Sequence, residues 1–224
     1  MQLATLHTSA MEPSAMKSSE MKSSEMKTAD KITTIRIILA PVFFAVLNLK
    51  FLNYWQIPVL WIIFIVAELT DMFDGMAARK KGEVSDFGKL YDPFADTLFQ
   101  ITIFFSFVMH NILPVIPFLL ILYREFAILF IRNIMLRKGI SMGARIGGKI
   151  KTVVYIIAAV LALIVYSLQR LAPCFADAGL SEVYNLIYPI MSRSAVYIFI
   201  LAVILSLLSF ADYVKVYRKT NNPD

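Results

Sequence analysis

Six long apolar segments follow one another from Lys31 onward, and they constrain the fold more than any other feature of the chain. Each is close to the roughly 20 residues that an α-helix needs to cross a bilayer. The segments cover residues 32–53, 55–79, 87–110, 113–137, 147–169 and 193–216, and only the connection at 170–192 is long. A soluble fold is excluded, because too few polar residues remain to cover six such helices. The sequence therefore predicts an all-α integral membrane protein with six transmembrane helices.

The composition agrees with this class and excludes several kinds of site. Apolar residues make up 58% of the 224 residues and charged residues 17%, against roughly 45–50% and about 25% in ordinary globular proteins. The single cysteine, Cys174, which we expect in the outer loop, excludes an internal disulfide framework and a cysteine zinc cluster. With only His7 and His110 present, a histidine metal site and a Ser-His-Asp triad are excluded too.

Two polar segments flank the apolar part of the chain. Residues 1–30 contain an imperfect Met-Lys-Ser-Ser-Glu repeat and lack an apolar stretch that could serve as a signal peptide. We expect a disordered, uncleaved tail there, with Met26 as an alternative start. Residues 31–219 form the predicted membrane domain, and residues 220–224 form a C-terminal tail.

Lys and Arg predict the orientation of the helices. With the N-terminus inside, one side of the membrane receives 16 of the 22 basic residues and the other side receives 3. Basic residues are retained on the cytoplasmic side of membranes, so both termini are expected in the cytosol. The net charge of +6 points in so apolar a chain to anionic lipid rather than to nucleic acid.

Four carboxylates stand at the cytosolic ends of the second and third predicted helices. Asp71 and Asp74 are spaced i, i+3, and Asp92 and Asp96 are spaced i, i+4, so each pair shares one helix face. A charged residue inside a spanning helix raises the free energy of membrane insertion by roughly 2.5–3.5 kcal/mol, so its presence calls for a functional explanation. The connection at residues 80–85 is short enough to make the two helices antiparallel, which brings all four carboxylates together.

Clustered carboxylates without His or Cys suit hard divalent cations. Two ions of Mg²⁺ or Mn²⁺ would neutralise the four charges. Gly75 and Gly88 allow a substrate to approach closely, and Arg79 supplies a cation for phosphate. These are the parts needed for attack on a phosphorus centre. The residues alone leave two alternatives: helix caps just outside the lipid, or the proton relay of a membrane cation or proton transporter.

This pattern resembles the signature of the CDP-alcohol phosphotransferase family. The match covers Asp71-x2-Asp74-Gly75-x2-Ala78-Arg79-x8-Gly88-x3-Asp92-x3-Asp96 at every fixed position. The resemblance implies a six-helix, cytosol-facing transferase that is usually a homodimer in the cytoplasmic (inner) membrane. It implies that the four Asp ligate metal and that Asp96 is also the general base. It further implies a CDP site at Asp71, Gly75, Ala78, Arg79 and Gly88.

A second, basic cluster follows on the fourth and fifth predicted helices. Arg124 and Arg132 are eight residues apart and lie on roughly one helix face. Arg145, Lys149 and Lys151 stand at the start of the next helix, where a helix N-terminus favours anions. We interpret the cluster as a pocket for a second phosphate. The alternative for Arg124 and Arg132 is a structural ion pair with Glu125 or Glu68.

Arg124-Glu125-x6-Arg132, followed by Gly148-Lys149-x-Lys151-Thr152, resembles the family's phosphatidylglycerophosphate synthases, as do residues 31–41. This resemblance implies that CDP-diacylglycerol is the donor and that sn-glycerol 3-phosphate is the acceptor. It adds Arg36 to the residues expected to bind the acceptor phosphate. Inositol phosphate remains the alternative acceptor within the family.

Overall fold

The structure, a computed structural model, describes residues 33–49, 54–81, 88–139 and 146–221. Long helices make up nearly all of these ranges, and no strand occurs among the described residues. The elements are a first helix at Thr33–Asn48, then α2 (Gln56–Lys81), α3 (Gly88–Met109), α4 (Val115–Arg137), α5 (Ile146–Asp177) and α6 (Ser181–Asn221). The predicted all-α class is confirmed. The polar tail at residues 1–30 lies outside the described part of the chain.

The predicted long connection at residues 170–192 is wrong. There α5 continues to Asp177, α6 begins at Ser181, and Cys174 lies within α5 rather than in a loop. The turn is short because Gly179 takes a left-handed backbone (φ +69°), which a residue without a Cβ adopts at little cost. The amide of Leu180 donates to the carbonyl of Phe175 (2.8 Å), and that of Gly179 donates to Ala176 (3.1 Å). These bonds close the last turn of α5 as helix C-caps commonly do.

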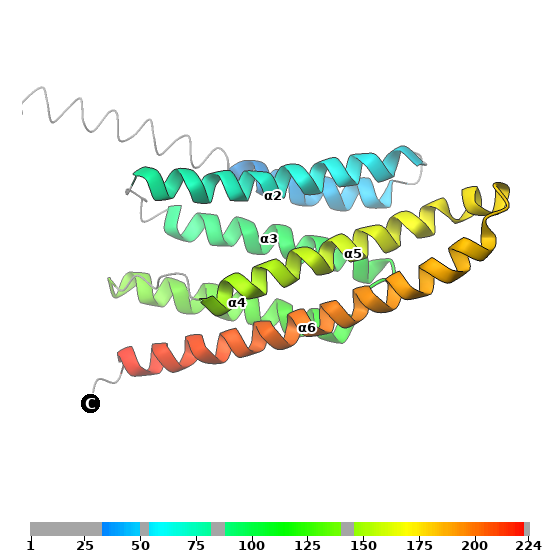
Figure 1. Cartoon of the computed structure of the whole chain (residues 1–224). Coiled ribbons are helices and arrows are strands. Elements are labelled where there is room, and N and C mark those ends of the chain that lie inside the picture. The colour runs from blue at the N-terminus through cyan, green and yellow to red at the C-terminus, as the bar shows by residue number, and fades with distance from the viewer. Residues whose placement is uncertain (1–32, 50–53, 82–87, 140–145, 222–224) are drawn as a thin grey trace, which may run out of the picture.

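The helices lie side by side along one long direction, so their ends gather at two opposite ends of the bundle (Figure 1). At one end, on the left of the view, α2, α4 and α6 finish while α3 and α5 begin. This alternation brings together residues that are far apart in the sequence. We call this the C-terminal end of the bundle, because α6, the last helix, ends there.

Aromatic side chains fill the centre of the bundle. Phe43 of the first helix meets Phe107 of α3 edge to face, and Phe104 lies between Tyr155 of α5 and Phe199 of α6. All five side chains are at most 1% exposed. Close packing of these rings contributes van der Waals contacts that hold the helices together.

Gln56 joins three elements at the opposite end of the bundle. It is 1% exposed, and its amide donates to the carbonyls of Val46, Leu47 (2.9 Å) and Leu49 (3.3 Å). The hydroxyl of Tyr166 on α5 lies 2.9 Å from the Leu47 carbonyl and 3.0 Å from Gln56 Oε1. The last carbonyls of a helix have no partner within the helix, so Gln56 satisfies those of the first helix.

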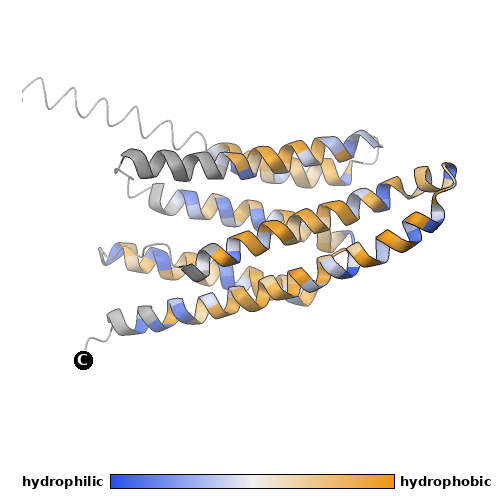
Figure 2. Cartoon of the chain, viewed as in Figure 1, coloured by the Kyte–Doolittle hydropathy of each residue, from blue (hydrophilic) through white to orange (hydrophobic). Residues whose placement is uncertain are grey.

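Within the described ranges, two helices are long and apolar enough to cross a membrane, judged by length and composition. They are the segments Ile150–Asp177 of α5 and Ser181–Lys215 of α6. Apolar residues dominate the middle of the bundle, and polar residues lie toward both of its ends (Figure 2). This distribution is consistent with a membrane protein.

Candidate functional site

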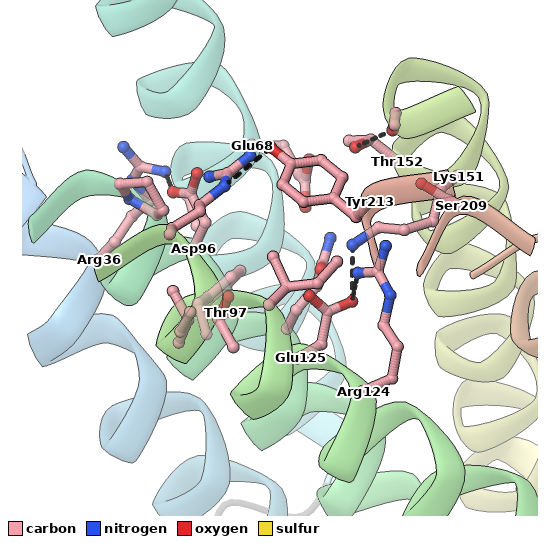
Figure 3. Close-up of a pocket in the computed structure, with 18 residues that line it drawn as sticks. Arg36, Glu68, Asp96, Thr97, Arg124, Glu125, Lys151, Thr152, Ser209 and Tyr213 are labelled. Atoms are coloured by element: carbon pink, nitrogen blue, oxygen red, sulfur yellow. Dashed lines mark hydrogen bonds and ion pairs between the residues drawn. The ribbon is translucent and has the colours of Figure 1, made fainter. Parts of the chain in front are cut away.

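A cavity of about 270 Å³ lies at the C-terminal end of the bundle. Its walls come from the first helix and from all five labelled helices (Figure 3). The lining residues are Arg36, Ala67, Glu68, Pro93, Asp96, Thr97, Phe99, Gln100, Arg124, Glu125, Ile128, Leu129, Arg132, Gly148, Lys151, Thr152, Ser209 and Tyr213. Four cations and three carboxylates therefore face one space.

Asp96 lines the acidic side of the cavity, Asp92 precedes it by one turn of α3, and both contact Arg36 of the first helix. Arg36 Nη2 lies 3.0 Å from Asp92 Oδ1, and Arg36 Nη1 forms an ion pair with Asp96. Thr33 adds a hydrogen bond to Asp92 Oδ1 at 3.0 Å. Arg36 is 2% exposed, whereas the two carboxylates are 46% and 41% exposed. The structure therefore places Arg36 with the acidic residues, although it also lines the common cavity.

The acidic side fits a divalent metal by the chemistry of its donors. The i, i+4 spacing puts Asp92 and Asp96 on one face of α3, where both already attract one cationic group. Their ligand atoms are oxygens, as Mg²⁺ and Mn²⁺ prefer. No group of three or more possible ligands occurs among the residues whose side chains the structure describes. The side chains of Asp71 and Asp74, in the last turns of α2, lie outside that set.

Arg124 and Lys151 meet on Glu125 at the basic side of the cavity. Glu125 Oε1 accepts from Arg124 Nη1 at 2.7 Å and from Lys151 Nζ at 2.6 Å. Arg124 Nε also donates to the backbone carbonyl of Ser206 at 3.1 Å. Figure 3 shows both cations pointing toward Glu125. The predicted ion pair between Arg124 and Glu125 is thus present, and the same cations line the cavity.

Arg132 lies two turns further along α4 and contacts Tyr213 of α6. Arg132 Nε lies 3.3 Å from the Tyr213 hydroxyl, and the guanidinium carbon lies 5.7 Å from the ring centroid. Within the described part of the chain, Arg132 makes no ion pair with a carboxylate. Arg124 and Arg132, eight residues apart on α4, both line this cavity.

Sequence reasoning missed the contribution of α6. Ser209 and Tyr213 line the cavity, and Ser206 is fully buried beside it. The three polar residues recur at i, i+3 and i+7 in an otherwise apolar helix, so they share a face. That pattern was the available signal. Thr97 and Thr152 also line the cavity, but nothing local in the sequence distinguishes them.

The remaining predicted site residues have side chains outside the described set. Gly75, Ala78 and Arg79 belong to the last turns of α2, Gly88 begins α3, and Lys149 lies in the first turn of α5. Arg145 itself falls outside the described residues. All of these positions are close in sequence to helix ends that gather at the C-terminal end of the bundle.

Comparison with known proteins shows the family of the chain. The family model for CDP-alcohol phosphatidyltransferase matches residues 26–210. The chain therefore belongs to the CDP-alcohol phosphatidyltransferase family, and the resemblance read from the motif is confirmed. Enzymes of this family generally use divalent metal ions.

Several curated relatives share more than a third of the aligned residues. One from Treponema pallidum, a CDP-diacylglycerol–glycerol-3-phosphate 3-phosphatidyltransferase, is 35% identical over 156 residues, which are 70% of this chain and 68% of the relative. One of the same name from Bacillus subtilis is 38% identical over 121 residues, or 53% of this chain and 62% of the relative. A probable phosphatidylglycerophosphate synthase from Mycobacterium tuberculosis is 34% identical over 125 residues, which are 55% of this chain and 59% of the relative. The last two alignments span less than two thirds of the relatives' length.

Proposed function

We propose that the chain transfers the phosphatidyl group of CDP-diacylglycerol to sn-glycerol 3-phosphate, which releases CMP and forms phosphatidylglycerol phosphate. One observation carries the proposal. A single cavity is lined by Asp96 and by three cations on neighbouring helices, Arg124, Arg132 and Lys151. A transferase that joins a diphosphate donor to an anionic acceptor needs carboxylates that can hold metal ions for the donor and cations that bind the acceptor. The names of the relatives support the choice of donor and acceptor.

The donor belongs on the acidic side. Asp71, Asp74, Asp92 and Asp96 would hold two Mg²⁺ or Mn²⁺ ions, and Gly75, Ala78, Arg79 and Gly88 would bind the CDP moiety together with Asp71. When bound, such ions neutralise phosphate oxygens and stabilise the charge that develops on the leaving group. Arg36 pairs with both Asp92 and Asp96 and so holds these two carboxylates next to each other.

The acceptor belongs on the basic side. A dianionic acceptor approaches a site that already holds a diphosphate, so it needs cations of its own. Arg guanidinium groups bind phosphate through two parallel hydrogen bonds. Arg124, Arg132 and Lys151 would therefore hold the acceptor phosphate. We extend this set to Arg36, Arg145 and Lys149 from the sequence.

The chemical step is a displacement at the β-phosphorus of the donor. A primary hydroxyl oxygen of the acceptor forms the new P–O bond, and the bond from the β-phosphorus to the bridging oxygen breaks, so that CMP leaves with the electron pair. Asp96 takes the hydroxyl proton as general base. Asp96 suits this role because it lines the same cavity as the three acceptor cations.

We further propose how the chain sits in the cell. Six helices cross the cytoplasmic (inner) membrane, with both termini and the cavity on the cytosolic side, and two copies form a homodimer. The distribution of Lys and Arg supports this orientation. Donor acyl chains then lie between helices that are open to lipid.

The test is release of CMP by purified protein from CDP-diacylglycerol with a panel of acceptors. We expect efficient turnover with sn-glycerol 3-phosphate and very poor turnover with glycerol or serine, because buried cations left unpaired penalise an acceptor without phosphate. Efficient turnover with glycerol or serine would refute the acceptor assignment. Preference for inositol phosphate would retain the phosphate pocket and change only the subfamily. No CMP release with any acceptor would favour the transporter alternative.

A further inference from the structure

Glu125 is a buried carboxylate at the point where three helices meet. It belongs to α4, and its side chain is 5% exposed. Its Oε1 atom accepts from Arg124 of the same helix and from Lys151 of α5. The hydroxyl of Tyr155 lies 3.1 Å from the same oxygen and 2.8 Å from Ser206 Oγ of α6. One carboxylate oxygen thus organises polar groups from α4, α5 and α6.

The two cations keep donors available after they bind Glu125. An ammonium group carries three N–H donors and a guanidinium carries five. Glu125 accepts from one N–H group of Lys151. Arg124 uses Nη1 to donate to Glu125 and Nε to donate to the Ser206 carbonyl. The remaining N–H groups can meet a ligand in the cavity that both residues line. Glu125 and a bound phosphate can therefore share the same two cations.

Burial makes the carboxylate necessary for this arrangement. The side chains of Arg124 and Lys151 are 4% and 12% exposed. Two like charges held close together away from water repel strongly, and the repulsion pushes the two side chains apart or toward solvent. Glu125 offsets that repulsion. With Arg132 included, the basic side then carries two net positive charges, which match the two negative charges of a phosphate monoester.

We propose that Glu125 is a positioning residue for the acceptor. It holds Arg124 and Lys151 in the arrangement that receives the acceptor phosphate, and it does so without contacting the reacting atoms. The inference rests on the proposed function and deepens it, because it assigns the acceptor half of the site to a preformed network. Tyr155 assists by fixing the carboxylate from α5, and its ring lies 4.6 Å from Lys151 Nζ.

The first experiment replaces Glu125 by its neutral isostere. In Glu125→Gln we expect the KM for sn-glycerol 3-phosphate to rise at least tenfold, while the KM for CDP-diacylglycerol and kcat stay within threefold. A purely structural role would lower the amount of active protein without this split. The matched control is Glu182→Gln, which removes the same charge from the exposed first turn of α6. An unchanged KM for the acceptor would overturn the proposal, and a lower KM would make Glu125 a competitor of phosphate instead.

A double-mutant cycle asks whether Glu125 acts through Lys151. If it does, Glu125→Gln should add little to the effect of Lys151→Gln on the acceptor KM, whereas it should add fully to Arg132→Gln. Equal additivity in both cycles would overturn the proposal. If Glu125→Gln does not fold, Glu125→Asp answers the same question, because it keeps the charge but withdraws the carboxylate by one methylene. We then expect a several-fold higher acceptor KM, and an unchanged KM would refute the inference.

A binding measurement separates this inference from the proposed function. Inorganic phosphate should raise the melting temperature of the wild-type protein in detergent and raise that of Glu125→Gln much less. If wild type turns over glycerol efficiently, the proposed acceptor is wrong, yet the phosphate result still reports on Glu125. If phosphate stabilises both proteins equally, Glu125 does not position the cations, whatever the acceptor is.

Discussion

Replacing Arg132 by alanine should weaken acceptor binding more selectively than any other single change at the basic side. Arg124 and Lys151 already share the charge of Glu125, and Arg36 faces Asp92 and Asp96. Arg132 contacts only the neutral Tyr213 hydroxyl through the interactions described above. Its positive charge is therefore the one most available to a phosphate.

The magnitude follows from the interaction that is lost. A hydrogen bond to a charged group contributes about 1.5–3 kcal/mol, and each 1.4 kcal/mol is roughly a tenfold change in affinity. The acceptor KM of Arg132→Ala should therefore rise roughly 10- to 150-fold. Arg132→Lys keeps the charge but loses the planar pair of donors, so its acceptor KM should lie between those of wild type and Arg132→Ala.

The assay measures CMP release from CDP-diacylglycerol in mixed micelles while each substrate is varied in turn. Arg137→Ala is the matched control, because Arg137 ends the same helix, is exposed and does not line the cavity. We expect the control to change neither KM by more than twofold. The reasoning is refuted if Arg132→Ala changes the acceptor KM less than threefold, or if the donor KM rises equally.

Three further outcomes are expected. Asp96→Asn should lower kcat by roughly 10²–10⁴-fold at saturating metal, since a general base contributes about that much. Near-normal turnover of Asp96→Asn would show that Asp96 is not the base. Asp92→Asn should also raise the metal concentration needed for activity. Deleting residues 1–25 should leave activity within a few-fold, measured on chains that insert normally, because the first motif-like residues come later. Gln56→Leu should lower the free energy of unfolding by about 1–3 kcal/mol, because the carbonyls of Leu47 and Leu49 lose a buried donor; thermal unfolding in detergent would detect it.

Local spacing predicted which polar side chains share a helix face. Asp92 and Asp96 face the same cation, and Arg124 and Arg132 line the same cavity, because i, i+4 and i, i+8 are fixed by the helical repeat. Most helix ends were predicted to within a few residues for a related reason. Apolar runs end where a chain leaves lipid or reaches a turn.

The turn between α5 and α6 could not be read in the same way. Polar residues such as Arg170 and Arg193 indicate contact with water, but they do not indicate that a helix has ended. Both α5 and α6 continue past these residues toward a short turn at Gly179. Hydropathy locates the bilayer and leaves open the secondary structure outside it.

Contacts between helices were the second part that the sequence could not supply. Arg36 reaches Asp92 across 56 positions, and Tyr155 reaches Ser206 across 51. No periodicity connects residues so far apart. Their pairing depends on which helix faces are buried together, which is a property of the whole bundle.

The composition of the cavity wall also has a consequence for synthesis of the chain. Its residues run from Arg36 in the first helix to Tyr213 near the end of α6. A ribosome that has added five of the helices has therefore made a protein whose substrate cavity still lacks one wall. The basic side acquires the Ser206 carbonyl and the Tyr213 hydroxyl only when the last helix joins the bundle. Chains that stop before α6 lack part of this cavity wall, so translation completes the cavity only when the molecule is nearly whole.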